Sequence, residues 1–326
     1  MPKKSFWQGK KVLVTGGTGF IGSFVCEQLL AKGAKVTATT KSGNLKNVSH
    51  LKKDLRIKKA NLADPGQAYL ATKNQEIVLN LASKVAGIQF NINHPATMFA
   101  PNVQIAQNIA SASVKNNVER LLIVSSACVY PRNCTIPTPE AEGFTLDPEP
   151  TNLGYGWAKR VEELIAKFYH LEFGLKVAIA RPYNAYGPRD NFDPQISHVI
   201  PGLIKRVAGD ENPLVVWGSG RQTRSFLYAG DLAQGLLDIT EKYPVADPLN
   251  LGTDEEITIA HLAKQIVKLS GKKVKITFDT TKPDGQPRRN CDTKKAKEKV
   301  GFEAKIPLEE GLKRTIDWYK KLNLPK

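Results

Sequence analysis

The chain has 326 residues, of which 41% are hydrophobic and 24% are charged, and these proportions are typical of a globular protein. Its net charge of +16 attracts polyanions, whether nucleic acid, a membrane surface or phosphorylated metabolites. No zinc-finger spacing or long basic run concentrates this charge, so nucleic acid is not expected as a partner. The sequence has no stretch of about 18 apolar residues, and no membrane-spanning helix is expected.

The N-terminal segment and the cysteines indicate a cytoplasmic protein. The basic segment 1–11 runs directly into Val12 to Thr15 and then glycines, without the hydrophobic core or cleavage site of a signal peptide. The four cysteines show no CxxC pair and no His-rich metal spacing. Neither a disulfide framework nor a metal site is therefore expected.

Short β-rich runs alternate with longer amphipathic stretches. The predicted strands cover residues 11–16, 34–40, 76–83, 120–130 and 176–187, and the predicted helices cover 20–33, 96–117 and 154–174. This alternation predicts an α/β fold with a Rossmann-type doubly wound parallel sheet. Ligands in such sheets bind beyond the carboxyl ends of the strands, so candidate site residues are sought there.

The second part of the chain predicts a smaller substrate-binding lobe. After Pro182 the sequence becomes rich in Pro, Asn, Asp and Gly, and helical segments follow around 199–207 and 229–243. We expect a dinucleotide-binding domain over 1–180 plus 225–252. A C-terminal lobe for a nucleotide sugar is expected over 181–224 plus 253–326.

The segment from Thr15 to Gly22, TGGTGFIG, lies between a predicted strand and a predicted helix, which is the context of a dinucleotide-binding turn. Glycines allow close backbone approach to a pyrophosphate, and the helix N-terminus supplies amide donors. A plain helix-entry turn is the alternative. The expected contacts in this turn are Gly16, Gly19, Phe20, Ile21 and Gly22.

The end of the second strand bears on the choice of cofactor. An acidic residue there accepts hydrogen bonds from the adenosine ribose in NAD-binding proteins, whereas this chain has Thr40 and Lys41. NADP(H) is therefore favoured, with NAD(H) as the alternative if Lys41 is only a surface lysine. The further predicted cofactor contacts are Asn61, Leu62, Leu81, Ala82, Lys84, Tyr155, Lys159 and Pro182.

Tyr155 and Lys159 are four residues apart on a predicted helix and share one face. A nearby ammonium group favours phenolate and makes a tyrosine a better proton-transfer group. Ser126 and Cys128 follow a predicted strand, which places a hydroxyl and a thiol at the expected site. Each signal has an ordinary structural alternative, namely a chance YxxxK spacing and plain core residues.

Together, TGGTGFIG, Ser126 and YGWAK resemble the extended short-chain dehydrogenase/reductases over essentially the whole chain. The resemblance implies that Ser126 and Tyr155 bind the substrate oxygen that undergoes redox, and that Tyr155 transfers its proton. It implies that Lys159 holds the nicotinamide ribose and lowers the tyrosine pKa. It also implies a homodimer formed through helices such as 96–115 and 156–173.

Within that superfamily, the middle and end of the chain resemble the GDP-L-fucose synthases, which epimerise and reduce GDP-4-keto-6-deoxymannose. The similar strings are KVAGI (84–88), ACVYP (127–131), YGPRDNF (186–192), SHVIP (197–201), VWGSG (216–220) and KPDGQPR (282–288). The resemblance implies that Cys128 and His198 are the epimerisation base and acid. It implies substrate contacts at Asn184, Val199, Trp217, Arg224 and Arg288.

Some residues also have simpler explanations, and the first domain departs from this subfamily. His198 could cap a helix or lie in the core, and Arg224 could be a surface charge.

The glycine turn has Gly17 and Thr18 where the subfamily carries His-Arg. This difference keeps open a nucleotide-sugar epimerase with tightly bound NAD(P) and no net redox, or a related colitose-type synthase. A non-catalytic dinucleotide-sensing or RNA-binding protein is a further alternative, supported only by the charge.

Overall fold

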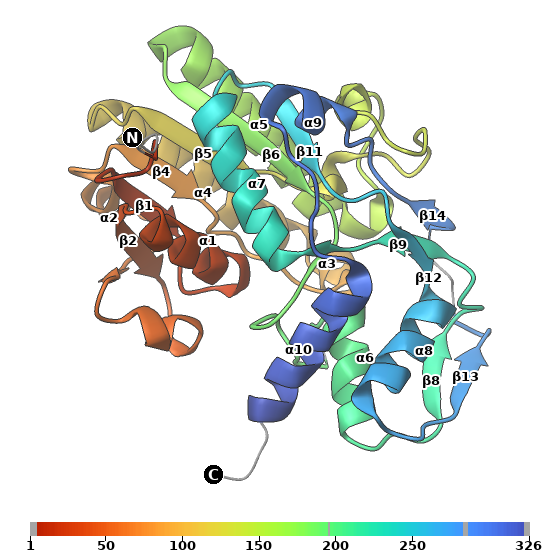
Figure 1. Cartoon of the computed structure of the whole chain (residues 1–326). Helices are drawn as coiled ribbons and strands as arrows, with labels where there is room; N and C mark the ends of the chain where they lie inside the picture. The colour runs from red at the N-terminus through yellow and green to blue at the C-terminus, as the bar shows by residue number, and fades with distance from the viewer. Residues whose placement is uncertain (1–4, 195, 283–285, 323–326) are drawn as a thin grey trace.

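A seven-stranded sheet lies at the centre of the computed structural model, which describes residues 5–194, 196–282 and 286–322 (Figure 1). All neighbouring strands in it are parallel, and their order is β11-β6-β5-β4-β1-β2-β3. The predicted Rossmann-type sheet is confirmed. Its strands are β1 (Lys11–Thr15), β2 (Lys35–Thr40), β3 (Arg56–Lys59), β4 (Ile77–Asn80), β5 (Arg120–Val124), β6 (Lys176–Pro182) and β11 (Pro248–Leu251).

Helices cover both faces of the sheet. Successive side chains on a strand point to opposite faces, so Val12 and Val14 of β1 pack in one apolar core and Leu13 packs in the other. The first core is covered by α1 (Phe20–Ala31) and α7 (Ala229–Lys242), which lie side by side in Figure 1. The second is covered by α2 (Pro65–Thr72), α4 (Pro95–Lys115) and α5 (Leu153–Phe173).

The sequence did not predict two elements of the sheet domain, β3 and α2. β3 has the sequence RIKK, whose ends are exposed and polar, so it lacks the apolar run that marks the other strands. α2 is only eight residues long and begins at Pro65. Asp64 caps it, because its side chain accepts a hydrogen bond from the Gln67 amide.

The C-terminal lobe consists of short strands and helices beside the carboxyl end of the sheet. Its helices pack on the same apolar core as α1 and α7, through residues such as Ile200, Leu203 and Leu262. The remaining helices are α3 (Ile88–Asn93), α6 (Val199–Ala208), α8 (Ile259–Ser270), α9 (Lys294–Val300) and α10 (Leu308–Leu322). The remaining strands are β7 (Ala185–Tyr186), β8 (Leu214–Trp217), β9 (Thr223–Ser225), β10 (Leu227–Tyr228), β12 (Glu256–Thr258), β13 (Ile276–Asp279) and β14 (Arg288–Arg289).

An ion pair ties the loop after β7 to the dinucleotide-binding half. Arg189 donates two hydrogen bonds to the Glu27 carboxylate on α1, at 3.0 and 2.8 Å, and its guanidinium lies 3.9 Å from the centre of the Phe24 ring. Segment 225–252 contributes β11 to the central sheet and α7 to the helices that cover one of its faces. The exact domain boundaries stay a prediction. Among the described helices, none combines the length and apolar character needed to cross a membrane.

Candidate active site

The glycine turn after β1 forms a tight cradle at the N-terminus of α1. Gly16 has a positive φ of 63°, and a Cβ at Gly22 would lie 2.3 Å from the Gly16 carbonyl oxygen. Glycine is therefore favoured at position 16 and required at position 22. Gly19 caps α1 without a side-chain hydrogen bond, so no capping side chain satisfies the first-turn amides, which include those of Phe20 and Ile21.

The cradle lies against the end of β4, where Ala82 is located. A Cβ at Gly16 would come within 3.2 Å of the Ala82 Cα, and the Ala82 amide donates to the Thr15 hydroxyl at 2.9 Å. Asn102 of α4 fixes the next segment by accepting from the Lys84 amide at 2.7 Å. The fold therefore brings Gly16 together with Leu81 and Ala82, and Lys84 follows two residues later on the same segment.

The carboxyl end of β2 presents no carboxylate. Thr40 is buried and its hydroxyl accepts from the Gly43 amide at 3.1 Å, whereas Lys41 is exposed. Asn61 and Leu62 follow the neighbouring β3, and Leu62 is buried. Pro182 ends β6 on the same edge of the sheet.

Tyr155 and Lys159 lie together on the first turns of α5. The Lys159 ammonium is 5.5 Å from the centre of the Tyr155 ring, and it donates to the Val124 carbonyl at the end of β5 at 2.9 Å. A Cβ at Gly156 would come within 2.5 Å of the Cys128 carbonyl oxygen. Glycine at this position thus lets α5 approach the segment that follows β5.

Burial and neighbouring groups shift the pKa of the Tyr155 phenol in opposite directions. Burial raises the pKa of Tyr155 above its ordinary value, and the Lys159 ammonium and a hydrogen bond with Ser83 act in the opposite direction. The pKa of Lys159 is also raised, because Glu162 and Tyr155 outweigh the effect of its burial. Lys159 therefore stays charged beside the phenol at neutral pH.

Ser126 and Cys128 lie in the 3-10 turn that follows β5. The Ser126 hydroxyl accepts from the Cys128 amide at 3.1 Å. The Cys128 sulfur is 3.9 Å from a terminal nitrogen of Arg289, which belongs to β14 of the C-terminal lobe. The thiol of Cys128 thus lies beside the guanidinium of Arg289.

His198 begins α6 in the lobe and faces a buried carboxylate. Its Nδ1 is 3.8 Å from Oδ1 of Asp190, whose side chain is 3% exposed. Interaction with Asp190 raises the pKa of His198 above its ordinary value. The His198 side chain is itself 56% exposed, so one side of the imidazole is open to solvent.

Arg224, one of the predicted substrate contacts, lies near a second arginine, Arg289. Arg224 is half-buried and donates to the carbonyls of Thr223 and Gln286 at 2.7 and 2.8 Å. Burial and the nearby Arg289 guanidinium lower the pKa of Arg224 to about 10. Among the described residues, no carboxylate forms an ion pair with Arg224 or Arg289, so their two positive charges attract anions.

Arg288, also a predicted substrate contact, forms an ion pair with Glu256. Its guanidinium is 52% exposed and bonds to both oxygens of Glu256, at 2.8 to 3.0 Å. Residues 283–285 of the KPDGQPR string lie outside the described residues. Trp217 is 65% exposed beside Lys282, Val199 is exposed at the start of α6, and the Asn184 amide donates to the Ser225 carbonyl.

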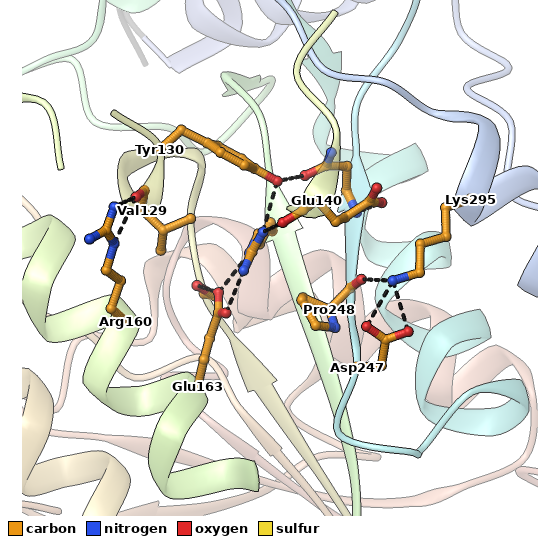
Figure 2. A network of polar contacts seen from close by, with 11 residues as sticks. Val129, Tyr130, Glu140, Arg160, Glu163, Asp247, Pro248 and Lys295 are labelled. Atoms are coloured by element: carbon orange, nitrogen blue, oxygen red, sulfur yellow. Dashed lines mark hydrogen bonds and ion pairs between the residues drawn. The ribbon is translucent and has the colours of Figure 1, made fainter. Parts of the chain in front are cut away.

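A buried polar network surrounds Val129 and Tyr130, the two residues that follow Cys128 (Figure 2). Arg181 of β6 donates two hydrogen bonds to Glu163 of α5, at 2.7 and 2.8 Å, and a third to the Tyr130 hydroxyl at 3.0 Å. Arg160 of α5 donates to the Val129 carbonyl at 2.9 and 2.7 Å. These bonds hold Val129 and Tyr130, which directly follow Cys128, so the fold fixes the chain on that side of the thiol.

A dinucleotide cradle combined with a tyrosine and lysine pair beside a strand-end serine defines a nicotinamide-dependent enzyme of the extended short-chain dehydrogenase/reductase type. The model of the NAD dependent epimerase/dehydratase family matches residues 12–252, and the chain belongs to this family. The predicted class of enzyme is confirmed.

Relatives and solved structures agree with this assignment. A probable GDP-L-fucose synthase of Oryza sativa subsp. japonica is 35% identical over 96% of this chain and 92% of its own length. A dTDP-4-dehydro-6-deoxy-D-allose reductase of Streptomyces is 31% identical over 96% of this chain and 97% of its own. The crystal structure of the UDP-glucose 4-epimerase of Thermotoga maritima superposes with a TM-score of 0.85 at 28% identity, covering 95% of this chain and 99% of that one.

Four residues near the site were not predicted from the sequence: Ser83, Glu162, Asp190 and Arg289. Asp190 lies inside the quoted YGPRDNF string and Arg289 directly follows KPDGQPR, so both were adjacent to recognised signals. Ser83 and Glu162 belong to a predicted strand and helix, where nothing local distinguishes them from structural residues. Their relevance appears only when α5 and the end of β4 are placed side by side.

Proposed function

We propose that this protein is an NADP(H)-dependent epimerase and reductase of a GDP-linked 4-keto-6-deoxyhexose. One observation carries the proposal: the Tyr155–Lys159 pair and the Cys128–Arg289 pair lie side by side at the carboxyl end of β5. The first pair suits proton transfer to a carbonyl oxygen, and the second suits proton removal from carbon. The curated relatives named as GDP-L-fucose synthases supply the substrate class.

The residues present fit a nicotinamide dinucleotide. The uncapped N-terminus of α1 and the glycine cradle suit its pyrophosphate, and Lys41 offers a cation near a ribose 2′-phosphate. When bound, the nicotinamide exchanges a hydride with sugar C4. Lys159 is placed to hold the adjoining ribose, and Tyr155 to give its proton to the C4 oxygen.

Epimerisation follows from the acidity that a C4 ketone gives to the hydrogens on C3 and C5. Ser126 and Tyr155 would stabilise the enolate oxygen by hydrogen bonds. Cys128, beside Arg289, would remove the proton from one face, and His198 would return a proton to the opposite face. The removed proton is then not the one returned, which is what inversion requires.

The nucleotide is assigned to the lobe. Arg224 and Arg289 lie close enough for their charges to repel each other, and an anion between them would relieve this repulsion. A diphosphate carries the oxygens that two guanidinium groups can bind. Arg288, held by Glu256, stays a candidate contact to the nucleotide or sugar. Assembly into a homodimer in the cytoplasm is part of the proposal.

A second candidate is a ketosugar reductase or epimerase that performs only one of the two reactions. Its support is the glycine turn, where Gly17 and Thr18 replace the His-Arg of the subfamily, together with the relatives named as dTDP-4-dehydro-6-deoxy-D-allose reductases. A Cβ at Gly17 would lie 2.6 Å from the Ala38 Cβ, so this turn is packed too tightly to accept a larger residue.

The decisive experiment incubates the purified protein with NADPH and a panel of nucleotide-linked 4-ketosugars. Products are identified by mass and NMR. The proposal expects a reduced sugar inverted at C3 and C5 from the GDP-linked substrate. Reduction without inversion, or inversion without consumption of NADPH, would favour the second candidate. No reaction with any GDP-linked ketosugar would contradict the assigned substrate.

A further inference from the structure

An acidic side chain that the proposed chemistry does not use lies next to the tyrosine and lysine pair. Glu162 Oε2 is 3.0 Å from the Lys159 ammonium, and the two side chains are 4% and 3% exposed. Tyr155, Lys159 and Glu162 are spaced i, i+4 and i+7, so they form one stripe along α5. Glu162 is thus the next charged group after Lys159 in a row that begins at the phenol.

The Lys159 ammonium has three protons, and two of its contacts are fixed by the fold. One is the Val124 carbonyl at 2.9 Å and the other is the Glu162 carboxylate. The Tyr155 ring lies on a further side of the same ammonium. A negative charge on Glu162 therefore offsets the positive charge that would otherwise act on the Tyr155 hydroxyl.

The ionisable groups around this row are few. Lys159 and Glu163 act on Glu162, and Glu163 is itself paired with Arg181. Lys159, Glu162 and Cys128 act on Tyr155. Burial raises the pKa of Glu162 to about 7, although Lys159 acts in the opposite direction. The carboxyl group thus changes charge within the neutral range.

We propose that Glu162 is a positioning residue that controls, through Lys159, how readily Tyr155 donates its proton during reduction. This inference rests on the proposed reductase function. When Glu162 is protonated, Lys159 acts on the phenol without opposition, so Tyr155 is a stronger acid. When Glu162 is ionised, the phenol is a weaker acid and proton donation is slower.

The test is the pH profile of hydride transfer from NADPH to an already epimerised ketosugar, so that the epimerisation residues are not required. The native rate is expected to fall about three- to tenfold as the pH rises through about 7, with an isotope effect from deuterated NADPH marking the hydride step. In Glu162→Gln this step in the profile should disappear. Glu172→Gln, an exposed change on the same helix, should keep the native profile.

A second readout does not depend on the substrate. The ultraviolet titration of the Tyr155 phenol, obtained by difference from Tyr155→Phe, should move down by about one pH unit in Glu162→Gln. If the native enzyme turns over no ketosugar, the proposed function fails while this titration still tests the inference. Turnover with an unchanged profile and an unchanged phenol titration in Glu162→Gln would overturn the inference alone.

A shorter variant covers the case in which Glu162→Gln does not fold. Glu162→Asp keeps a carboxyl group but withdraws it from Lys159 by one methylene. The fall in rate as the pH rises should be smaller in this variant than in the native enzyme. The pH at which the Tyr155 phenol titrates should lie between that of the native enzyme and that of Glu162→Gln. A full native step and titration in Glu162→Asp would count against the proposed control by Glu162.

Discussion

The Arg289 guanidinium lies 3.9 Å from the Cys128 sulfur, and the neighbouring Arg288 is turned away to an ion pair with Glu256. The two arginines form β14, in which successive side chains point to opposite sides. Only one of two adjacent and identical side chains therefore reaches the candidate base. This geometry supplies a matched pair of variants.

Replacing Arg289 with Gln is expected to slow alkylation of Cys128 by iodoacetamide at pH 7 by about three- to tenfold, because it removes a cation that lies 3.9 Å from the reacting sulfur. Arg288→Gln is the control and should alkylate at the native rate. Both are measured in a Cys134→Ser background by mass spectrometry, since Cys26 and Cys291 are buried. Equal rates in the two variants would remove Arg289 from the proposed activation of Cys128.

Replacing Tyr155 with Phe is expected to lower the rate of hydride transfer by about 10²- to 10⁴-fold, because no other group would donate a proton to the C4 oxygen. NADPH oxidation at 340 nm measures this loss. Cofactor binding, followed by thermal shift, should be retained. Native turnover in a folded Tyr155→Phe would show that the proton comes from elsewhere.

Replacing Lys41 with Glu is expected to weaken NADPH binding about tenfold relative to NADH, because a carboxylate repels the 2′-phosphate that the ammonium attracts. Titration of intrinsic fluorescence with each cofactor gives the two affinities. Lys46→Glu, an exposed change in the 3-10 segment that follows, is the control. Native protein that binds both cofactors equally, with no change in Lys41→Glu, would contradict the preference for NADP(H).

Stability is expected to depend on the ionisation of Glu162. Its pKa is raised in the folded state to about 7, so its contribution to stability is fully present below its unfolded pKa and is lost as the pH rises through about 7. Between pH 4 and pH 8 the native protein should therefore lose about 3 kcal/mol that Glu162→Gln does not lose. Urea unfolding at several pH values measures the difference. Parallel losses in both proteins would place the titrating group elsewhere.

Local periodicity accounts for what the sequence predicted well. The five predicted strands and the helix with Tyr155 and Lys159 were predicted from apolar runs and from the i, i+4 spacing, and the structure contains them as β1, β2, β4, β5, β6 and α5. The glycine turn was predicted because its steric requirement is visible in the residue types. Each of these signals is contained in one short segment of the chain.

The missed features depend on contacts between distant segments. Arg289 contacts Cys128 across 161 positions of sequence. The KPDGQPR string predicted Arg288 as the contact, because the string does not show that alternate side chains of β14 point to opposite sides. Ser83 approaches Tyr155 only because β4 ends and α5 begins at the same edge of the sheet. Glu162 resembled any helical glutamate, and its burial beside Lys159 is a property of the packed α5.

The most direct test of two activities in one site follows solvent deuterium into the product. In deuterated water the native enzyme, supplied with NADPH and the GDP-linked 4-ketosugar, should incorporate deuterium at C3 and C5, as read by NMR. Cys128→Ser should lose most of this exchange, because a hydroxyl is far harder to ionise than a thiol of nearly the same size. It should still reduce an already epimerised ketosugar at close to the native rate. Exchange at the native rate in Cys128→Ser would contradict the assignment of Cys128 as the base.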